Sequence, residues 1–526
     1  MIQFIPCVKN HDKGKAPEYR GRESKMTEEV KKSLDIVYKT MDQMDIYRHA
    51  AKVLQYDQET ICPAKAMEEQ GEITAFLGNK AYALTKIKKY IDAVAFLYKN
   101  KSMLDEFDQA MITCEYEDYL KNKNLTSAMN HRFSLIYNKA FVNWVNAKQK
   151  SDFSVFETSL GKVRDTEIKK IALRERKMKN SYDNLLDDYE KGMTVQDLDD
   201  YFGKCKDRLI PILQKIVCSK KKIRTDFLSR TVTKAQQEQM AEYLLNIMGF
   251  DFERGAFTTS EHPFTDDLGR NDVRVTTHYY PDMFYSSMFS IIHEGGHALF
   301  EQYQPQENYE HHLYNKTMGQ HESVSRFYEN RIGRSRSFIH LIYPKAKEIF
   351  PQVFADVSEQ EFYEAMNVVQ PSLIRTESDE FTYTFHIIIR YELEKEIIGG
   401  NVSIADLPEM WNQKYEEYLG IRPQNDRDGI LQDMHWTSGF GYFPTYALGN
   451  MYNAMYYNRM AQDIDIEKCI AEGQLEKING WMKEHVWEKA DRQAPKIWLH
   501  EITGRDFTPD DFLDYLTEKY TKIYEL

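Results

Sequence analysis

Two histidines and one glutamate in the stretch "IIHEGGHALF" have the residue types and spacing of a metal site. His293 and His297 are four positions apart, and Glu294 directly follows the first histidine. On a helix, positions i and i+4 lie on one face, about 5–6 Å apart, so both imidazoles can bind one Zn²⁺ ion. Glu294 is rotated by about 100° from His293, so it can reach a water molecule beside the metal. This division of roles is typical of H-E-x-x-H metallopeptidases, whose glutamate is the general base.

A third metal ligand has to come from another segment. The metzincin pattern would place a glycine and a third histidine where this chain has Phe300 and Tyr303, so that class is excluded. A glutamate on a later helix is the other common solution, and Glu322 is the leading candidate. Arg326 lies one turn after it and can hold the carboxylate in place. The rival carboxylates are Glu301, Glu307 and Glu310.

The elements that must position these residues are helices. Apolar residues recur at three- and four-residue steps through most of the chain from about residue 30 to 250, which predicts a mostly α protein. The stretch "DVRVTTHYY" alternates instead and predicts a short strand just before the histidine helix. Gly295 and Gly296 are poor helix formers, so we expect a neighbouring element to approach the backbone there. We expect one large domain over residues 26–526, after a flexible extension at residues 1–25.

Composition excludes several classes of function. The net charge of −13 and the pI near 5.7 argue against a nucleic-acid-binding protein. Six scattered cysteines without a C-x-x-C pair are typical of a reducing cytoplasm. No apolar run approaches the roughly 20 residues that a membrane helix needs. We therefore expect a cytoplasmic protein that binds neither nucleic acid nor membrane.

Six short stretches in order resemble the carboxypeptidase Taq family of zinc metallocarboxypeptidases. They are "HPF" (262–264), "DVRVT" (272–276), "HEGGH" (293–297), "HES" (321–323), "IRTESD" (374–379) and "GILQDMHW" (429–436). The one departure is Ser378, where the family usually has alanine. The resemblance implies a helical, saddle-like fold with a deep groove, a small sheet beside the metal, and a homodimer. It implies that His293, His297 and Glu322 are the ligands, that Glu294 is the base, and that single residues are removed from peptide C-termini.

A carboxypeptidase must bind a free terminal carboxylate, which a guanidinium does with two parallel hydrogen bonds. Arg375 is the leading candidate, and Arg422 is a weaker one. The segment "IRTESDEFTYTFHIIIRYELEKEI" is interpreted as one helix, with a polar stripe that faces a cleft or a buried network. The stripe consists of Arg375, Asp379, Thr382, His386 and Arg390.

The stretch that follows "GILQD" supplies candidate groups for the reaction. A positioned donor can stabilise the negative charge that develops on the carbonyl oxygen, and His435 is the first choice. Tyr442 and Tyr446 are candidate substrate contacts, although packing in the core explains them about equally well. Asp272 and Arg274 are interpreted as a structural pair on the predicted strand.

The predicted function is a zinc-dependent metallocarboxypeptidase that acts on peptides with a free C-terminus. Co²⁺ or Mn²⁺ could occupy the same ligands. The alternative is a related zinc oligopeptidase or dipeptidyl carboxypeptidase with a glutamate ligand, because the chemistry of these enzymes is the same and only the ends of the cleft differ. A non-catalytic helical scaffold with a vestigial metal site is a further alternative, and the intact Glu294 argues against it.

Overall fold

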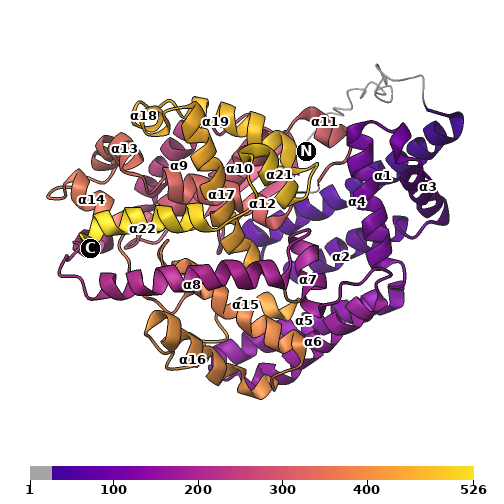
Figure 1. Cartoon of the computed structure of the whole chain (residues 1–526), viewed down its shortest axis with the longest axis horizontal. Helices are drawn as coiled ribbons and strands as arrows, with labels where there is room; N and C mark the ends of the chain where they lie inside the picture. Colours follow the sequence, from indigo (N-terminus) through magenta and orange to yellow (C-terminus); the bar gives the residue numbers. More distant parts are fainter. Residues whose placement is uncertain (1–25, 315) are drawn as a thin grey trace, which may run out of the picture.

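The computed structural model describes residues 26–314 and 316–526, so the extension predicted at residues 1–25 lies outside the described residues. The described chain is mainly helical, as predicted, with one small sheet (Figure 1). None of its helices is both long and apolar enough to cross a lipid bilayer.

The first half of the chain is a run of helices. They are α1 (Glu28–Thr60), α2 (Met67–Leu84), α3 (Lys88–Lys99), α4 (Glu106–Asn122), α5 (Ser127–Lys150), α6 (Ser154–Leu173), α7 (Ser181–Tyr189), α8 (Val195–Val217) and α9 (Lys234–Met248), with the short 3₁₀ turns η1 (Lys101–Met103) and η2 (Asp226–Ser229).

The second half follows the sheet. Its helices are α10 (Phe284–Gln302), α11 (Gln306–Glu310), α12 (Met318–Arg326), α13 (Arg336–Ile349), α14 (Glu359–Met366), α15 (Tyr383–Gly399), α16 (Leu407–Leu419), α17 (Pro444–Asp463), α18 (Ile466–Ala471), α19 (Leu475–Met482), α20 (Glu488–Ala490), α21 (Pro495–Thr503) and α22 (Asp510–Tyr524). Short 3₁₀ turns are η4 (Arg375–Glu377), η5 (Ile404–Asp406) and η6 (His435–Thr437), and η3 (Phe327–Ile332) and η7 (Lys483–Trp487) are π-helical.

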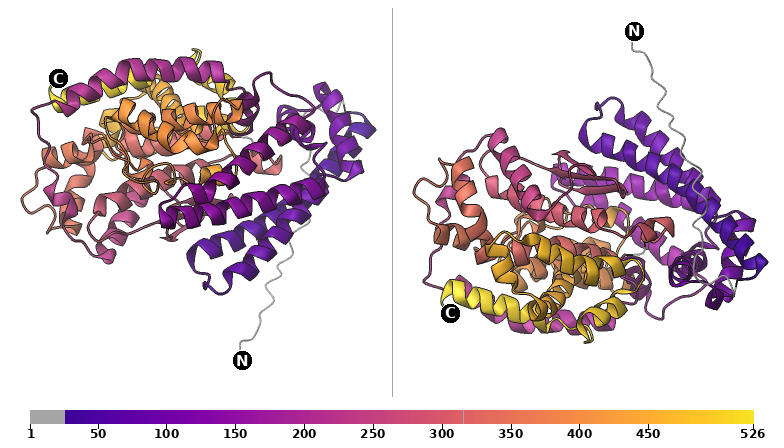
Figure 2. Two further views of the ribbon diagram at one scale, coloured as in Figure 1. Left: turned by 90° about the horizontal axis from the view of Figure 1, so that it is seen from below. Right: turned by 90° about the horizontal axis from the view of Figure 1, so that it is seen from above.

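Buried apolar side chains form two clusters. The larger one joins helices from α5 to α22 and includes most of α10, α15 and α17. The smaller one belongs to α1, α3 and α4, with one residue from α2, and takes in Leu104 before α4 and Leu313 from the segment after α11. In Figure 2 these N-terminal helices form an arm that diverges from the larger body. The arm is tied to the body beside the sheet, where His49 and Lys52 of α1 hydrogen-bond the carbonyls of Leu268 and Asp267.

The sheet has three strands in the order β1-β3-β2: β1 (Gly255–Thr259), β2 (Thr265–Gly269) and β3 (Asp272–Thr277). Strand β1 is parallel to β3, and β2 is antiparallel to it. Val273 and Val275 of β3 are fully buried, as the alternation predicted. Asp272 and Arg274 pair with one another through two 2.8 Å contacts, in agreement with their structural interpretation.

The helix predicted from Ile374 begins later than expected, so that prediction was wrong. Residues 375–377 form the 3₁₀ turn η4, and α15 starts only at Tyr383. Asp379 explains the break, because its carboxylate accepts hydrogen bonds from the backbone N–H groups of Phe381, Thr382 and Gln370. These local bonds compete with the helical ladder. Arg375 and Asp379 therefore do not share a helical stripe with Arg390.

Candidate metal centre and active site

Helix α10 carries the two histidines and packs closely against α12. A Cβ atom at Gly296 would lie 2.9 Å from the backbone Cα of Ser325 in α12, closer than a Cβ atom approaches another heavy atom in proteins. A Cβ at Gly295 would lie 3.0 Å from the side chain of Met248. The close approach expected from the two glycines is therefore present, and it brings the second candidate helix next to the first.

His293, His297 and Glu322 converge on one point. The Nε2 atoms of the histidines lie 3.6 and 3.5 Å from Oε2 of Glu322. Their ligand atoms all lie within 4.8 Å of one another. These separations are too long for good hydrogen bonds. They are close to the ~3.4 Å between ligand atoms that bonds of ~2.0–2.2 Å give around a tetrahedral metal ion.

Glu329 orients His293 from behind. The Nδ1 atom of His293 lies 2.8 Å from Oε2 of Glu329, and a carboxylate can only accept. Nδ1 therefore carries a proton, and in the neutral imidazole that binds a metal the lone pair belongs to Nε2, on the side of Glu322. Metal-binding histidines usually have such a carboxylate partner, which fixes their tautomer and ring orientation.

His297 is oriented by a longer chain of contacts. Its Nδ1 lies 2.5 Å from Nδ1 of His321, and Nε2 of His321 lies 2.7 Å from Oε1 of Glu301. Because Glu301 accepts from Nε2 of His321, Nδ1 of His321 has the lone pair and accepts from His297. The Nε2 lone pair of His297 is again left for a metal. Lys316 lies 3.2 Å from Glu301 and compensates its buried charge.

Glu322 is held as a carboxylate. Arg326, one turn later, donates Nε to its Oε1 at 2.8 Å, as the sequence suggested. Although burial acts in the opposite direction, Arg326 and the two histidines hold the pKa of Glu322 well below its usual range. Helix α17 presses on it from the other side, because a Cβ at Gly449 would lie 2.9 Å from its carbonyl carbon and Cγ.

Glu294 contacts the sheet and lies near the charges of His293 and Glu322. Thr265 of β2 donates its hydroxyl to Oε2 of Glu294 at 2.7 Å. Burial raises the pKa of Glu294 above that of a free glutamate. A buried carboxylate with a raised pKa is suited to accept a proton and release it again.

The donor set fits a divalent zinc ion. Two neutral imidazole nitrogens and one carboxylate oxygen form a common catalytic zinc ligand set, which leaves the fourth position open. Both imidazoles have their second nitrogen committed, and the glutamate is charge-compensated by Arg326. The residues present therefore fit the metal that this pattern implies.

A second cluster of charges lies beside the metal centre. Arg375 donates Nε and Nη2 to Asp433 at 3.2 and 2.9 Å, and Arg390 donates Nε to the same carboxylate at 2.7 Å. Arg375 also donates Nη1 to the hydroxyl of Tyr383 at 3.2 Å. The guanidinium of Arg326 lies over the ring of Tyr383, 4.3 Å from its centroid, which connects the cluster to the metal trio. Two guanidiniums share one carboxylate, so the cluster has an excess of positive charge.

His435 lies in the turn η6, next to this cluster. Its Nε2 is 3.3 Å from the hydroxyl of Tyr446, and its buried Nδ1, 4.0 Å from Asp433, has no hydrogen-bond partner in the part of the chain that the structure describes. Burial lowers the pKa of His435 to about 4, so the imidazole is neutral near pH 7. Glu394 holds the same loop by accepting from Nε1 of Trp436 and from the N–H of Gly441.

The remaining candidates divide into two groups. Tyr442 and Tyr446 lie with His435, with ring centroids 5.5 and 6.1 Å from it. Arg422 lies at the surface after α16, where it pairs with Glu409 and Glu416. Within the described residues it has no contact with the metal trio or with Asp433. The geometry therefore favours Arg375 over Arg422 as the partner of a substrate carboxylate.

Several residues of the site carried no sequence signal. Asp433 lies inside the "GILQDMHW" stretch, yet only the fold shows that it joins two arginines. Thr265 had no signal and reaches Glu294 from strand β2, whereas Glu301, a rival ligand in the sequence, contacts His321 instead. Glu329 had a signal, since it lies seven residues after Glu322, but its contact with His293 joins two separate helices.

Comparison with known proteins identifies the family. The model of the carboxypeptidase Taq (M32) metallopeptidase family matches residues 36–520. Carboxypeptidase 1 of Bacillus subtilis is 36% identical over 488 residues, which cover 91% of this chain and 96% of that protein. The crystal structure of the M32 carboxypeptidase from Deinococcus radiodurans has a TM-score of 0.91 at 29% identity, covering 94% of this chain and all of that one. The structure of Pyrococcus furiosus carboxypeptidase has a TM-score of 0.89 at 32% identity, covering 94% of this chain and 99% of that one.

The match extends over most of the chain, and it includes the helices that carry the histidines, the third ligand and the arginine cluster. It confirms the resemblance seen in the six short stretches. The protein belongs to the carboxypeptidase Taq (M32) family of metallocarboxypeptidases.

Proposed function

We propose that this protein is a zinc-dependent carboxypeptidase that releases single amino acids from the free C-terminus of peptides. The observation that supports it most strongly is the convergence of His293, His297 and Glu322. Each of the three is oriented by a hydrogen bond to a second residue, namely Glu329, His321 and Arg326 respectively. When bound there, zinc supplies Lewis-acid polarisation of the scissile carbonyl and acidifies a water molecule. The donor set also accepts Co²⁺ or Mn²⁺.

Glu294 is the proposed general base. It takes the proton from the attacking water and returns it to the leaving amine. Its hydrogen bond to Thr265 fixes the carboxylate, and its buried environment makes proton uptake easier than for an exposed glutamate. His435 and Tyr446 are the proposed donors to the carbonyl oxygen as it becomes negative. A neutral imidazole has a single N–H group, so His435 can donate one hydrogen bond to this oxygen.

Arg375 is the proposed partner of the terminal carboxylate. Its cluster has two guanidiniums and one carboxylate, so the approach of a second carboxylate is electrostatically favourable. Tyr442 and Tyr446 are proposed to contact the substrate next to it. The contact between Arg375 and the terminal carboxylate distinguishes a carboxypeptidase, which requires a free C-terminus, from an oligopeptidase, which does not.

Replacement of Glu294 by glutamine tests the base. The expected result is a protein that binds zinc like the wild type but has lost turnover by about 100- to 10,000-fold, as measured by metal analysis and release of amino acids. A glutamine variant that no longer binds zinc would assign Glu294 to the ligands instead. Thr265→Val is a matched milder variant, because it removes only the hydrogen bond to Glu294.

Domain organisation, assembly and location are further proposals. Residues 26–526 are proposed to act as a single domain, even though the arm has an apolar cluster of its own. The described cysteines are all free thiols, which supports a reducing cytoplasm. A homodimer is proposed from family membership, and size-exclusion chromatography with light scattering tests it.

A further inference from the structure

Arg331 is a buried cation that has no counter-ion among the described residues. It lies in the π segment η3 and is only 7% exposed. The rings of Tyr457 and Tyr515 lie against its guanidinium, with centroids 3.8 and 3.7 Å from Cζ. Within the described part of the chain, no hydrogen bond or ion pair reaches it, and its Nε and Nη1 are buried without a partner. Buried charges are normally paired, so an unpaired guanidinium points to a missing anion.

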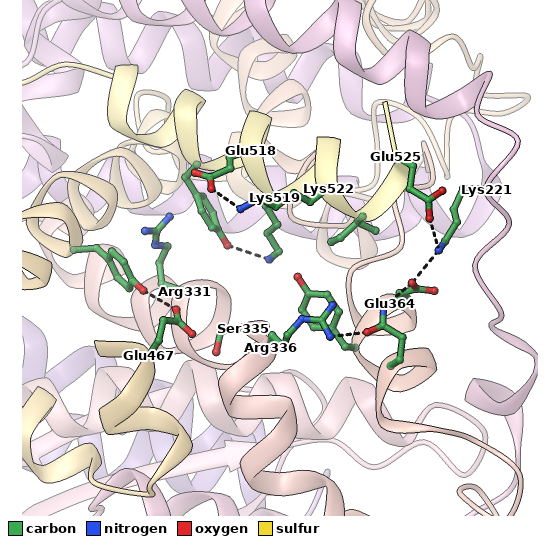
Figure 3. Close-up of a pocket in the computed structure, with 15 residues that line it drawn as sticks. Lys221, Arg331, Ser335, Arg336, Glu364, Glu467, Glu518, Lys519, Lys522 and Glu525 are labelled. Atoms are coloured by element: carbon green, nitrogen blue, oxygen red, sulfur yellow. Dashed lines mark hydrogen bonds and ion pairs between the residues drawn. The ribbon is translucent and has the colours of Figure 1, made fainter. Parts of the chain in front are cut away.

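Arg331 lines a surface cavity of about 470 Å³, called here the Arg331 cavity. Figure 3 shows Lys519 of α22 directed into the space between that helix and Ser335 and Arg336, whereas Lys522 runs along α22 to Glu518. A cavity of this volume accommodates a small-molecule ligand. The cations that line it are Lys221, Arg331, Arg336, Lys519 and Lys522.

The acidic residues of the cavity are already committed to other groups. Glu364 and Glu525 both pair with Lys221, and Glu518 pairs with Lys522. Glu467 accepts hydroxyl hydrogen bonds from Tyr457 and Ser337, which leave its charge uncompensated, but it forms no ion pair with Arg331 among the described residues. None of these carboxylates neutralises Arg331.

Two further groups are suited to an anion. Arg336 donates to the neutral amide of Gln360 and stacks on Tyr363, and it has no carboxylate partner among the described residues. Ser335 caps the first turn of the 14-residue helix α13, whose N-terminus opens on the cavity. The first N–H groups of a helix attract anions through their unpaired donors and the helix dipole.

We propose that the Arg331 cavity binds a small oxyanion of the phosphate class, with Arg331 and Arg336 as its main cationic partners. The ligand is inorganic phosphate or the phosphoryl group of a small organic phosphate, since the cavity is larger than a phosphate ion. The site is separate from the metal centre and does not depend on the proposed peptidase activity.

Binding can be measured with the full-length, metal-loaded protein by isothermal titration calorimetry and by thermal unfolding. The probes are inorganic phosphate and adenosine monophosphate, each against sodium chloride of equal ionic strength. We expect saturable binding and a rise in Tm. Tighter binding of the nucleotide would identify an organic phosphate as the ligand, and equal or weaker binding would identify the inorganic ion.

Three variants separate this site from others. Arg331→Met is expected to weaken binding at least about tenfold, as expected for loss of a charged hydrogen bond. Arg336→Gln, at a less buried position, is expected to weaken it about threefold or more and covers the case in which the first variant does not fold. Arg48→Gln, on the distant helix α1, is the matched control and is expected to bind like the wild type.

Two results would overturn the proposal. One is the absence of any saturable response to either probe. The other is a response that is unchanged in Arg331→Met and Arg336→Gln but disappears when the metal is removed with a chelator, because phosphate would then be bound at the metal centre.

Discussion

The contact between Glu329 and His293 should set the affinity for the metal. In Glu329→Gln, the amide oxygen can still accept the hydrogen bond from Nδ1 of His293, which is 2.8 Å long in the wild type, but the negative charge of the acceptor is lost. A hydrogen bond to a charged group contributes about 1.5–3 kcal/mol and a neutral one about 0.5–1.5 kcal/mol. The difference of roughly 1–1.5 kcal/mol corresponds to about a five- to twelvefold weaker binding of zinc. This agrees with the roughly 10–100-fold effect of losing such supporting groups altogether.

The assay is a competition titration of zinc against a chromophoric chelator, which does not depend on peptidase activity. Glu359→Gln is a matched control, because Glu359 forms the same type of carboxylate–imidazole pair with His340 at an exposed place. It should leave zinc affinity unchanged. If Glu329→Gln binds zinc as tightly as the wild type, or if both variants lose affinity equally, the proposed role of the pair is refuted.

Three further predictions concern the packing and charge around the site. Gly449→Ala should weaken zinc binding in the same titration, because the added Cβ would meet Glu322 at 2.9 Å, whereas Gly480→Ala, where a Cβ meets nothing within 4 Å, should not. Asp433→Asn should lower the free energy of unfolding in urea by about 3–5 kcal/mol, because it leaves Arg375 and Arg390 as buried cations without a counter-ion; a loss below 1 kcal/mol would contradict this. Burial raises the pKa of Glu394 to about 7, so the folded state keeps a proton that the unfolded chain releases, and the free energy of unfolding should fall as the pH rises from about 4.5 to 7. In the Glu394→Gln variant, the free energy of unfolding measured by urea titration should fall less steeply over this pH range. A slope equal to that of the wild type would show that Glu394 is not protonated in the folded protein.

The sequence predicted the part of the site that depends on local geometry. His293 and His297 share a helical face because of their spacing alone, and Arg326 reaches Glu322 because they are one turn apart. Burial of Val273 and Val275 and the pairing of Asp272 with Arg274 also follow from positions close together in the chain.

The rest depended on contacts between distant segments. Glu301 was a rival ligand in the sequence, but the fold directs it to His321, and Asp433 had no role until it was placed between Arg375 and Arg390. The predicted start of α15 was wrong because the carboxylate of Asp379 accepts hydrogen bonds from the N–H groups of Phe381 and Thr382, where the predicted helix would have continued. Periodicity does not reveal such competition, since it depends on the orientation of one carboxylate.

Digestion of one peptide in three forms tests the central proposal most directly. The free, N-terminally acetylated and C-terminally amidated forms are incubated with the zinc-loaded protein and with a chelator, and the products are read by mass spectrometry. We predict stepwise loss of single residues from the C-terminus of the free and acetylated forms, no change in the amide, and no reaction with the chelator. Cleavage of all three forms would contradict the proposal, because the enzyme would then be an oligopeptidase and Arg375 would have no terminal carboxylate to bind.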